Sequence, residues 1–177
     1  MNDLGEFDPP MFWACMDKPG QMVNSYSKDL TSIGLYNPPD SGVILALHHL
    51  NGVMMSVGSG SQTDFLMTQP LSIVPDNIIY LPIRSSKLTF PPTSKAIAIS
   101  QATLPAESYP IMVVDHFAGG SAMMESPSVK THMIHGTVEL MPNSIVTIQG
   151  TGPQHLAWWS IFWKEVPIVQ DQIYRNL

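Results

Sequence analysis

Short apolar runs alternate with turn-forming residues along the chain from residue 42 onward. The runs recur at the roughly 8–12-residue spacing that is typical of all-β sandwiches and barrels. No window of helical length carries a sustained apolar stripe at i, i+3 and i+4, and the best helical candidate is the short tail 168–177. The pattern therefore predicts an all-β fold. The expected strands are 43–50, 53–57, 78–84, 88–90, 95–103, 111–117, 129–134, 137–141, 144–149 and 156–166.

Asn51-Gly52 separates the apolar run 43–50 from the run 53–57. This dipeptide between apolar runs is the strongest short-range signal for a β-hairpin, because both residues tolerate the positive φ angles of a tight turn. We therefore expect the chain to reverse at Asn51-Gly52 and the two runs to pair as a hairpin.

The segment 95–103 shows the alternation of a half-buried strand. Successive side chains of a strand point to opposite faces, so small residues line one face here and isoleucines line the other. The small residues are Ala96, Ala98 and Ser100, and the isoleucines are Ile97 and Ile99.

The segment 155–165 is apolar on both faces, unlike a strand that has one face in water. One face can fill the core of the sandwich, while the other must meet a second layer, the N-terminal segment or a neighbouring subunit. Burial by the chain itself and burial by a neighbouring subunit stay equally open. Trp159, Ile161 and Trp163 share one face, and Leu156, Trp158 and Phe162 share the other with Ser160.

Residues 1–40 differ from the rest, because proline pairs and a Pro-Gly step interrupt them between aromatic residues. Proline fixes φ and removes a hydrogen-bond donor, which excludes a long helix or a central strand. We expect 1–40 to be an extended arm that packs along its own domain or onto a neighbour. The sequence then divides into this arm, a β-domain over 41–166 and a C-terminal tail over 167–177.

Charged residues make up only 12% of the 177 residues, and the formal net charge is −6. The acidic balance argues against nucleic-acid binding, which uses basic patches to neutralise phosphates. The single cysteine, Cys15, excludes an internal disulfide framework, and no apolar run is long enough for a membrane-spanning helix.

Residues 41–63 and 140–163 contain no charged side chain. A surface this neutral favours a protein that neighbours cover in an assembly, and a monomer coated with uncharged polar side chains is the alternative.

The histidines are the main candidates for metal chemistry. His48 and His49 are adjacent, so in a regular strand their side chains point to opposite faces and cannot both ligate one ion without a bulge. The segments 42–49 and 136–144 are similar to the two motifs of cupins, which are metal-binding β-barrels. The first lacks the glutamate of that motif, and the second is followed by Thr147 at the ligand position. We expect no metal and no cofactor, and a cupin-like metal-dependent enzyme stays an alternative.

Patterns of other catalytic sites are missing from the sequence. There is no Gly-x-Ser-x-Gly elbow and no lysine after a glycine-rich loop, so we expect no catalytic residue. Exposed tryptophans on a β-sandwich can stack on sugar rings, which makes a carbohydrate-binding or receptor-binding module a second alternative.

The segments 139–148 and 159–165 together resemble the final strands of small jelly-roll virion proteins of bacteriophages. The first has a Leu-x-Pro-Asn turn before a strand, and the second is a closing strand with tryptophans and the acidic residue Glu165. The resemblance implies a jelly-roll fold, a location in the virion and a role as a capsid, decoration, fibre or tail protein. It also implies association with other virion proteins and with copies of the chain, with a symmetric trimer favoured.

The sequence therefore predicts a single jelly-roll-like antiparallel sandwich or barrel with an extended N-terminal arm. We expect a non-enzymatic structural component of a phage-like particle that acts through subunit association, with no nucleic-acid or membrane partner. The candidate interface residues are Phe12, Trp13, Tyr26 and Tyr36 from the arm and Trp159 and Trp163 from the last strand.

Overall fold

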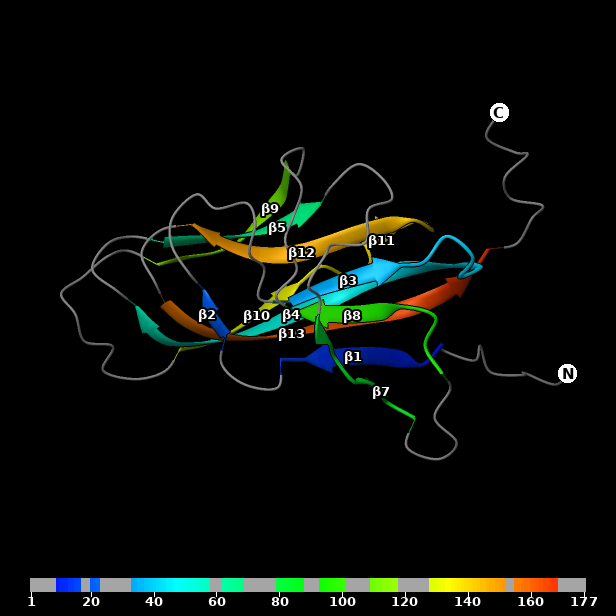
Figure 1. Cartoon of the computed structure of the whole chain (residues 1–177), viewed down its shortest axis with the longest axis horizontal. Helices are drawn as coiled ribbons and strands as arrows, with labels where there is room; N and C mark the ends of the chain where they lie inside the picture. Colours follow the sequence, from blue (N-terminus) through cyan, green and yellow to red (C-terminus); the bar gives the residue numbers. More distant parts are fainter. Residues whose placement is uncertain are drawn as a thin grey trace, which may run out of the picture.

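A computed structural model of the chain contains only β-strands as regular elements within its described residues (Figure 1). Those residues are 9–16, 20–22, 33–57, 62–68, 79–87, 93–100, 109–117, 128–151 and 155–168. The predicted all-β class is therefore confirmed. The strands are β1 (Met11–Cys15), β2 (Gly20–Met22), β3 (Ile33–Asn37), β4 (Val43–Val57), β5 (Gln62–Thr68), β6 (Ile79–Tyr80), β7 (Ile83–Ser85), β8 (Ile97–Ser100), β9 (Tyr109–Phe117), β10 (Ser128–Met133), β11 (Glu139–Leu140), β12 (Ser144–Thr151) and β13 (His155–Pro167).

The strands form two antiparallel sheets that pack face to face as a β-sandwich (Figure 1). Sheet A has the order β10-β4-β13-β1-β7, with β11 paired to β4 and β2 paired to β13. Sheet B has the order β6-β8-β3-β12-β5-β9. The described residues contain no helix long and apolar enough to cross a membrane. The expected strand 88–90 and the helical tail after Ile168 lie outside the described residues.

The eight strands of five residues or more pair in a nested order. The first pairs with the last (β1 with β13), the second with the seventh (β3 with β12), the third with the sixth (β4 with β10) and the fourth with the fifth (β5 with β9). Two further pairs, β13 with β4 and β12 with β5, join these strand pairs into the two sheets. Among the described strands, the nested order therefore pairs segments from the two ends of the chain inward.

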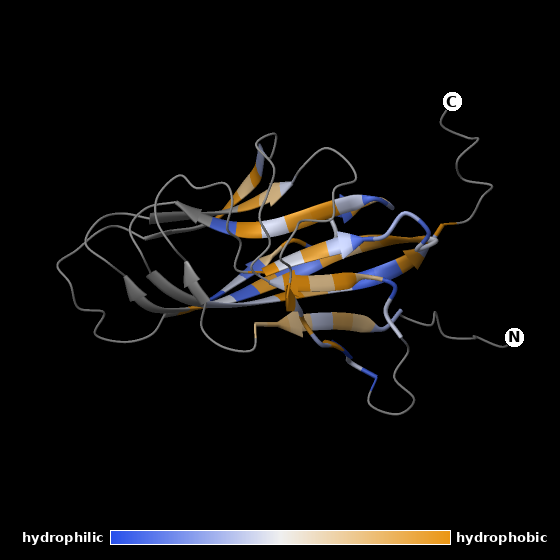
Figure 2. Ribbon diagram, viewed as in Figure 1, coloured by the Kyte–Doolittle hydropathy of each residue, from blue (hydrophilic) through white to orange (hydrophobic). Residues whose placement is uncertain are grey.

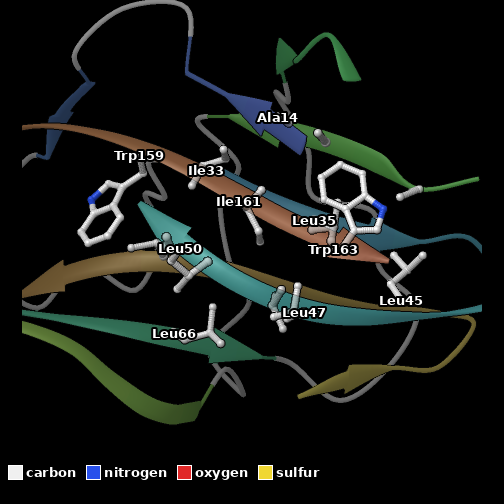
Figure 3. Packing of buried hydrophobic residues seen from close by; sticks show 14 of the residues in the cluster. Ala14, Ile33, Leu35, Leu45, Leu47, Leu50, Leu66, Trp159, Ile161 and Trp163 are labelled. Carbon is white, nitrogen blue, oxygen red and sulfur yellow. The ribbon is translucent and has the colours of Figure 1, made fainter. Parts of the chain in front are cut away.

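The core lies between the two sheets and is built from the inward faces of their strands (Figure 3). Strand β13 contributes Trp159, Ile161 and Trp163 to it, the face that the sequence predicts to be shared by these three side chains. Hydropathy alternates along the central strands, as expected for strands with one face in the core (Figure 2). Strand β4 of sheet A contributes Leu45, Leu47 and Leu50, and strands β3 and β5 of sheet B contribute Ile33, Leu35 and Leu66.

The predicted hairpin at Asn51-Gly52 is wrong, because β4 runs without a turn through both residues. Asn51 pairs with Ser160 and Gly52 pairs with Trp159 in β13. A Cβ atom added at Gly52 would lie 2.4 Å from the Trp159 ring. The glycine is therefore explained by the close approach of an indole ring to the backbone, a role that Gly in a strand commonly has.

The predicted arm is also wrong for the described parts of residues 1–40. Strand β1 lies between β13 and β7 in sheet A, and β3 lies between β12 and β8 in sheet B. The positions of the prolines are compatible with strands inside the sheets. Pro9-Pro10 end just before β1, and Pro38-Pro39 come just after β3, so neither pair removes a donor from a strand interior. These two strands belong to the same sandwich as residues 41–166.

Residues 96–100 confirm the alternation predicted over 95–103, and residues 101–103 lie outside the described residues. Ala96 and Ala98 belong to the core between the sheets. Ile99, with Ile97 packed beside it, joins Tyr36 and Ile145 in a second buried cluster that does not include the core residues. Sheet B therefore buries apolar side chains on both of its faces.

Candidate functional site

Four of the six candidate interface residues are buried within the chain itself. Phe12, Trp159 and Trp163 are at most 2% exposed and lie in the main core, and Tyr36 lies in the second cluster. Their assignment as contact residues for a partner is therefore wrong. Strand β13 is central in sheet A, so its inward side chains are covered by sheet B. Trp13 is half-buried, and Tyr26 lies outside the described residues.

The outward face of sheet A carries a row of stacked side chains that crosses four strands. We call it the aromatic row: His48 and His49 on β4, Phe162 on β13, Trp13 on β1 and Arg84 on β7. The ring centroids of His49 and Phe162 are 3.9 Å apart, and those of Phe162 and Trp13 are 6.1 Å apart. The guanidinium carbon of Arg84 lies 5.9 Å from the Trp13 ring centroid. Such cross-strand pairs stabilise sheets and explain why β13 is apolar on both faces.

A β-bulge in β4 brings the two histidines of this row together. Phe162 pairs with His49 and Trp163 pairs with Leu47, so His48 is an extra residue with no partner in β13. The Nδ1 atoms of His48 and His49 are 2.8 Å apart. The expectation that the two side chains point to opposite faces is therefore wrong, because a bulge breaks the two-residue period.

Hydrogen bonds from the chain after β10 hold the bulge in place. The backbone N–H groups of Ile134 and His135 both donate to the His48 carbonyl, at 2.8 and 2.9 Å. The Gly136 N–H donates to the Leu47 carbonyl at 2.7 Å. His135 and Gly136 have positive φ angles of 54° and 78°, which lets the chain turn sharply at this point.

Burial and a neighbouring charge both affect the pKa of His49. Desolvation by burial, followed by the nearby charge of His48, lowers the pKa of His49 from its usual value. The ring of His135 lies edge-on to His48, with centroids 6.1 Å apart. At a separation of 2.8 Å, one Nδ1 atom donates a hydrogen bond and the other accepts it.

The cupin alternative needs its metal ligands to converge inside the barrel, and the described residues do not provide such a set. His48 and His49 lie on the outward face of sheet A, while the inward positions are filled by apolar side chains. The Thr147 hydroxyl, at the predicted ligand position, is buried and has no hydrogen-bond partner among the described residues. Among the described residues, no group of three or more His, Cys, Asp or Glu side chains is arranged to hold a metal ion.

An open cleft of about 790 Å³ lies at the Arg84 end of the aromatic row. Strands β6, β7 and β8 and the residues beside them form much of its wall. Two cations and several hydroxyl groups line it, and the described lining contains no carboxylate, although the whole chain has a net charge of −6. Its polar and aromatic lining includes Trp13, Tyr80, Arg84, Ser86, Lys87 and Ser94.

Many of the large exposed apolar side chains lie on strands that end the sheets, although Trp158 and Val166 of the central strand β13 are exposed as well. In β9, the edge strand of sheet B, Tyr109, Ile111 and Val113 are 52%, 41% and 53% exposed. In β10, the edge strand of sheet A, Val129 and Met133 are exposed as well. The sequence reasoning missed these residues as interface candidates.

A signal for the β9 edge was present in the sequence. Pro110 lies inside β9, and proline within a strand is confined to edges, to the strand start or to bulges because it cannot donate to the ladder. An apolar strand that contains proline is therefore a candidate for an exposed sheet edge.

Comparison with known proteins gives no relative. No family model, no curated protein and no solved structure matches this chain.

Proposed function

We propose that the protein is a non-enzymatic structural subunit of a phage-like particle and that copies of it associate through the exposed edge strand β9. The observation that carries this proposal is the row of exposed apolar side chains along β9, which ends sheet B. Its role would be that of a capsid, decoration, fibre or tail protein located in the virion.

The strand order supports a jelly roll as the finer description of the sandwich. A jelly roll contains eight strands in two sheets, with two Greek keys, and it is used by viral capsid proteins, lectins and cupins. The nested pairing of β1 with β13, β3 with β12, β4 with β10 and β5 with β9 fits a long hairpin rolled into such a fold. The apolar filling of the space between the sheets favours a structural or binding protein over a cupin enzyme.

The edge strand β9 has the properties of an association site. Within the described residues it pairs with β5 alone, so its outer edge offers unpaired backbone donors and acceptors. Soluble monomers usually protect such an edge with charges or cover it, because an exposed apolar edge pairs with other chains. Tyr109, Ile111 and Val113 are all exposed, although an irregularity in the pairing with β5 at Ile111 breaks the two-residue period between Tyr109 and Val113.

Native mass tests the proposal. We expect the purified chain to exceed its 19.5 kDa monomer mass, with a trimer favoured, and to form particles by electron microscopy. Ile111→Lys or Val113→Lys should reduce the native mass, because a desolvated ammonium opposes pairing. Met141→Lys is the matched control, since Met141 is equally exposed and lies between β11 and β12. A wild-type protein that is monomeric at high concentration contradicts the proposal.

A carbohydrate-binding role is the second candidate, and the cleft beside Trp13 favours it. Trp13 and Tyr80 offer aromatic surfaces to a sugar ring, and Arg84 offers a guanidinium to a carboxylate. Sialyllactose, with lactose as the neutral comparison, tests this role by calorimetry. We expect Arg84→Ala to abolish binding and Lys95→Ala, which changes an exposed cation outside the cleft lining, to leave it unchanged. Equal binding of both sugars, or none, rejects an acidic-sugar site.

A further inference from the structure

We propose that His48 and His49 form a chelating site for a divalent transition-metal ion, Cu²⁺ or Ni²⁺, on the outward face of sheet A. The two Nδ1 atoms are 2.8 Å apart and belong to adjacent residues of a β-bulge. The site is separate from the β9 edge and from the cleft, so it stands independently of the proposed function.

The backbone fixes the relative position of the two imidazoles. Two N–H groups, from Ile134 and His135, donate to the His48 carbonyl, and this double contact maintains the bulge. Adjacent residues in a regular strand would place their side chains on opposite faces. The two Nδ1 atoms lie close together here because β4 has a bulge in its pairing with β13. The hydrogen bonds from the residues after β10 stabilise that bulge.

The aromatic row restrains the ring of His49. That ring stacks on Phe162 with a centroid separation of 3.9 Å and an interplanar angle of 17°. The His135 ring lies edge-on to His48, with ring centroids 6.1 Å apart. A ligand pair that is already oriented loses little rotamer entropy when an ion binds.

The separation of the nitrogens indicates which ions fit. Two nitrogens that each lie about 2.0 Å from one metal are about 2.8 Å apart at a right angle and about 3.3 Å apart at the tetrahedral angle. The 2.8 Å separation of the hydrogen-bonded pair is close to the value for a right angle, so square-planar or octahedral coordination needs little movement of the two rings. Cu²⁺ and Ni²⁺ prefer these geometries with nitrogen ligands, whereas Zn²⁺ prefers the tetrahedral one.

The hydrogen shared by the two Nδ1 atoms must move before both of them can bind an ion. In the neutral pair, one ring carries its hydrogen on Nδ1 and the other presents a lone pair. When a metal ion binds both Nδ1 atoms, that hydrogen moves to Nε2 of the same ring, so no net proton is lost. Both rings are half-buried, so solvent can reach an ion bound between them.

Calorimetric titration of the full chain with Ni²⁺ at neutral pH tests the site. We expect one ion per chain, with a Kd at least about tenfold weaker for His48→Ala and for His49→Ala, since even outer-shell changes at metal sites cost about that much. His155→Ala is the control and should bind like the wild type, because His155 pairs with Val57 far along β13 from the bulge. Electron paramagnetic resonance of the Cu²⁺ complex should show two coupled nitrogens.

Several outcomes overturn the proposal: no stoichiometric binding of Ni²⁺ or Cu²⁺, an affinity unchanged by both histidine variants, or tighter binding of Zn²⁺ than of Ni²⁺. Thermal unfolding of each metal-free variant shows whether it folds. If an alanine variant unfolds, His48→Gln and His49→Gln replace it, because the amide keeps the polarity of the ring. Loss of binding in folded glutamine variants supports the site as well.

Discussion

Strands β13 and β9 are both rich in apolar side chains, but they differ in how far those side chains are buried. Trp159, Ile161 and Trp163 of β13 are buried in the core, whereas Ile111 and Val113 of β9 are exposed. Strand β13 has β4 on one side and β1 on the other, while β9 ends its sheet. The position of a strand in the sheet order therefore decides which of its apolar residues are available to a partner.

This comparison moves the proposed interface from the tryptophans to the edge. Aromatic residues are enriched in protein interfaces, which made Trp159 and Trp163 plausible contact residues from the sequence. Aromatic residues also dominate cores, and both tryptophans lie at most 1% exposed in this one. Changes in β13 should therefore affect stability, and changes in β9 should affect association.

The largest effect is expected from deletion of residues 1–38. The deletion removes β1 and β3, which lie inside the two sheets and supply Phe12 and Leu35 to the core. A domain is stable by only about 5–15 kcal/mol, so loss of two interior strands should unfold it. Near-UV circular dichroism and thermal unfolding measure this. A truncated chain that keeps a native spectrum would restore the arm interpretation.

Trp163→Ala should destabilise the protein by about 3–5 kcal/mol, the usual cost of truncating a buried tryptophan. The indole is fully buried and stacks on Phe12, with ring centroids 6.1 Å apart. Urea denaturation followed by fluorescence gives the free energy of unfolding. A loss below about 1 kcal/mol would indicate that Trp163 is not part of the core.

Gly52→Ala should cost about 1–3 kcal/mol, because the new Cβ forces the Trp159 ring or the strand to shift. The same substitution in a Trp159→Leu background should cost less, since the ring that approaches Gly52 is gone. The difference between the two costs, measured as a double-mutant cycle, gives the coupling of the two residues. Equal costs in both backgrounds would place the origin of the effect elsewhere.

Val113→Ser should change the free energy of unfolding by no more than about 0.5 kcal/mol, as is usual for exposed positions. The same variant should weaken self-association, because it removes apolar surface from the β9 edge. Denaturation and native mass, measured on one preparation, separate these two effects. A large loss of stability would show that β9 is covered within the monomer.

The bulge at His48 and the continuation of β4 through Asn51-Gly52 are two features that could not be predicted from the sequence. Asn51-Gly52 has the residues of a tight turn, but the same glycine also suits a strand that an indole ring approaches closely. Likewise, the adjacent residues His48 and His49 are expected to point to opposite faces of a regular strand. The hydrogen bonds that Ile134 and His135 donate to the His48 carbonyl maintain a bulge that the sequence does not reveal. Both features depend on a partner that is distant in the sequence.

The sequence by itself determined the β class and the alternation within single strands, such as the face shared by Trp159, Ile161 and Trp163. These follow from the two-residue period of extended chain, which is a property of neighbouring residues. Only the tertiary structure decided the strand order and with it the edges, the bulge and the interior position of β1. Strand order rests on contacts between remote segments, such as the Asn37 side-chain amide that donates to the Leu140 carbonyl at 2.8 Å. A local pattern of residues carries no information about which remote segment will pair with it.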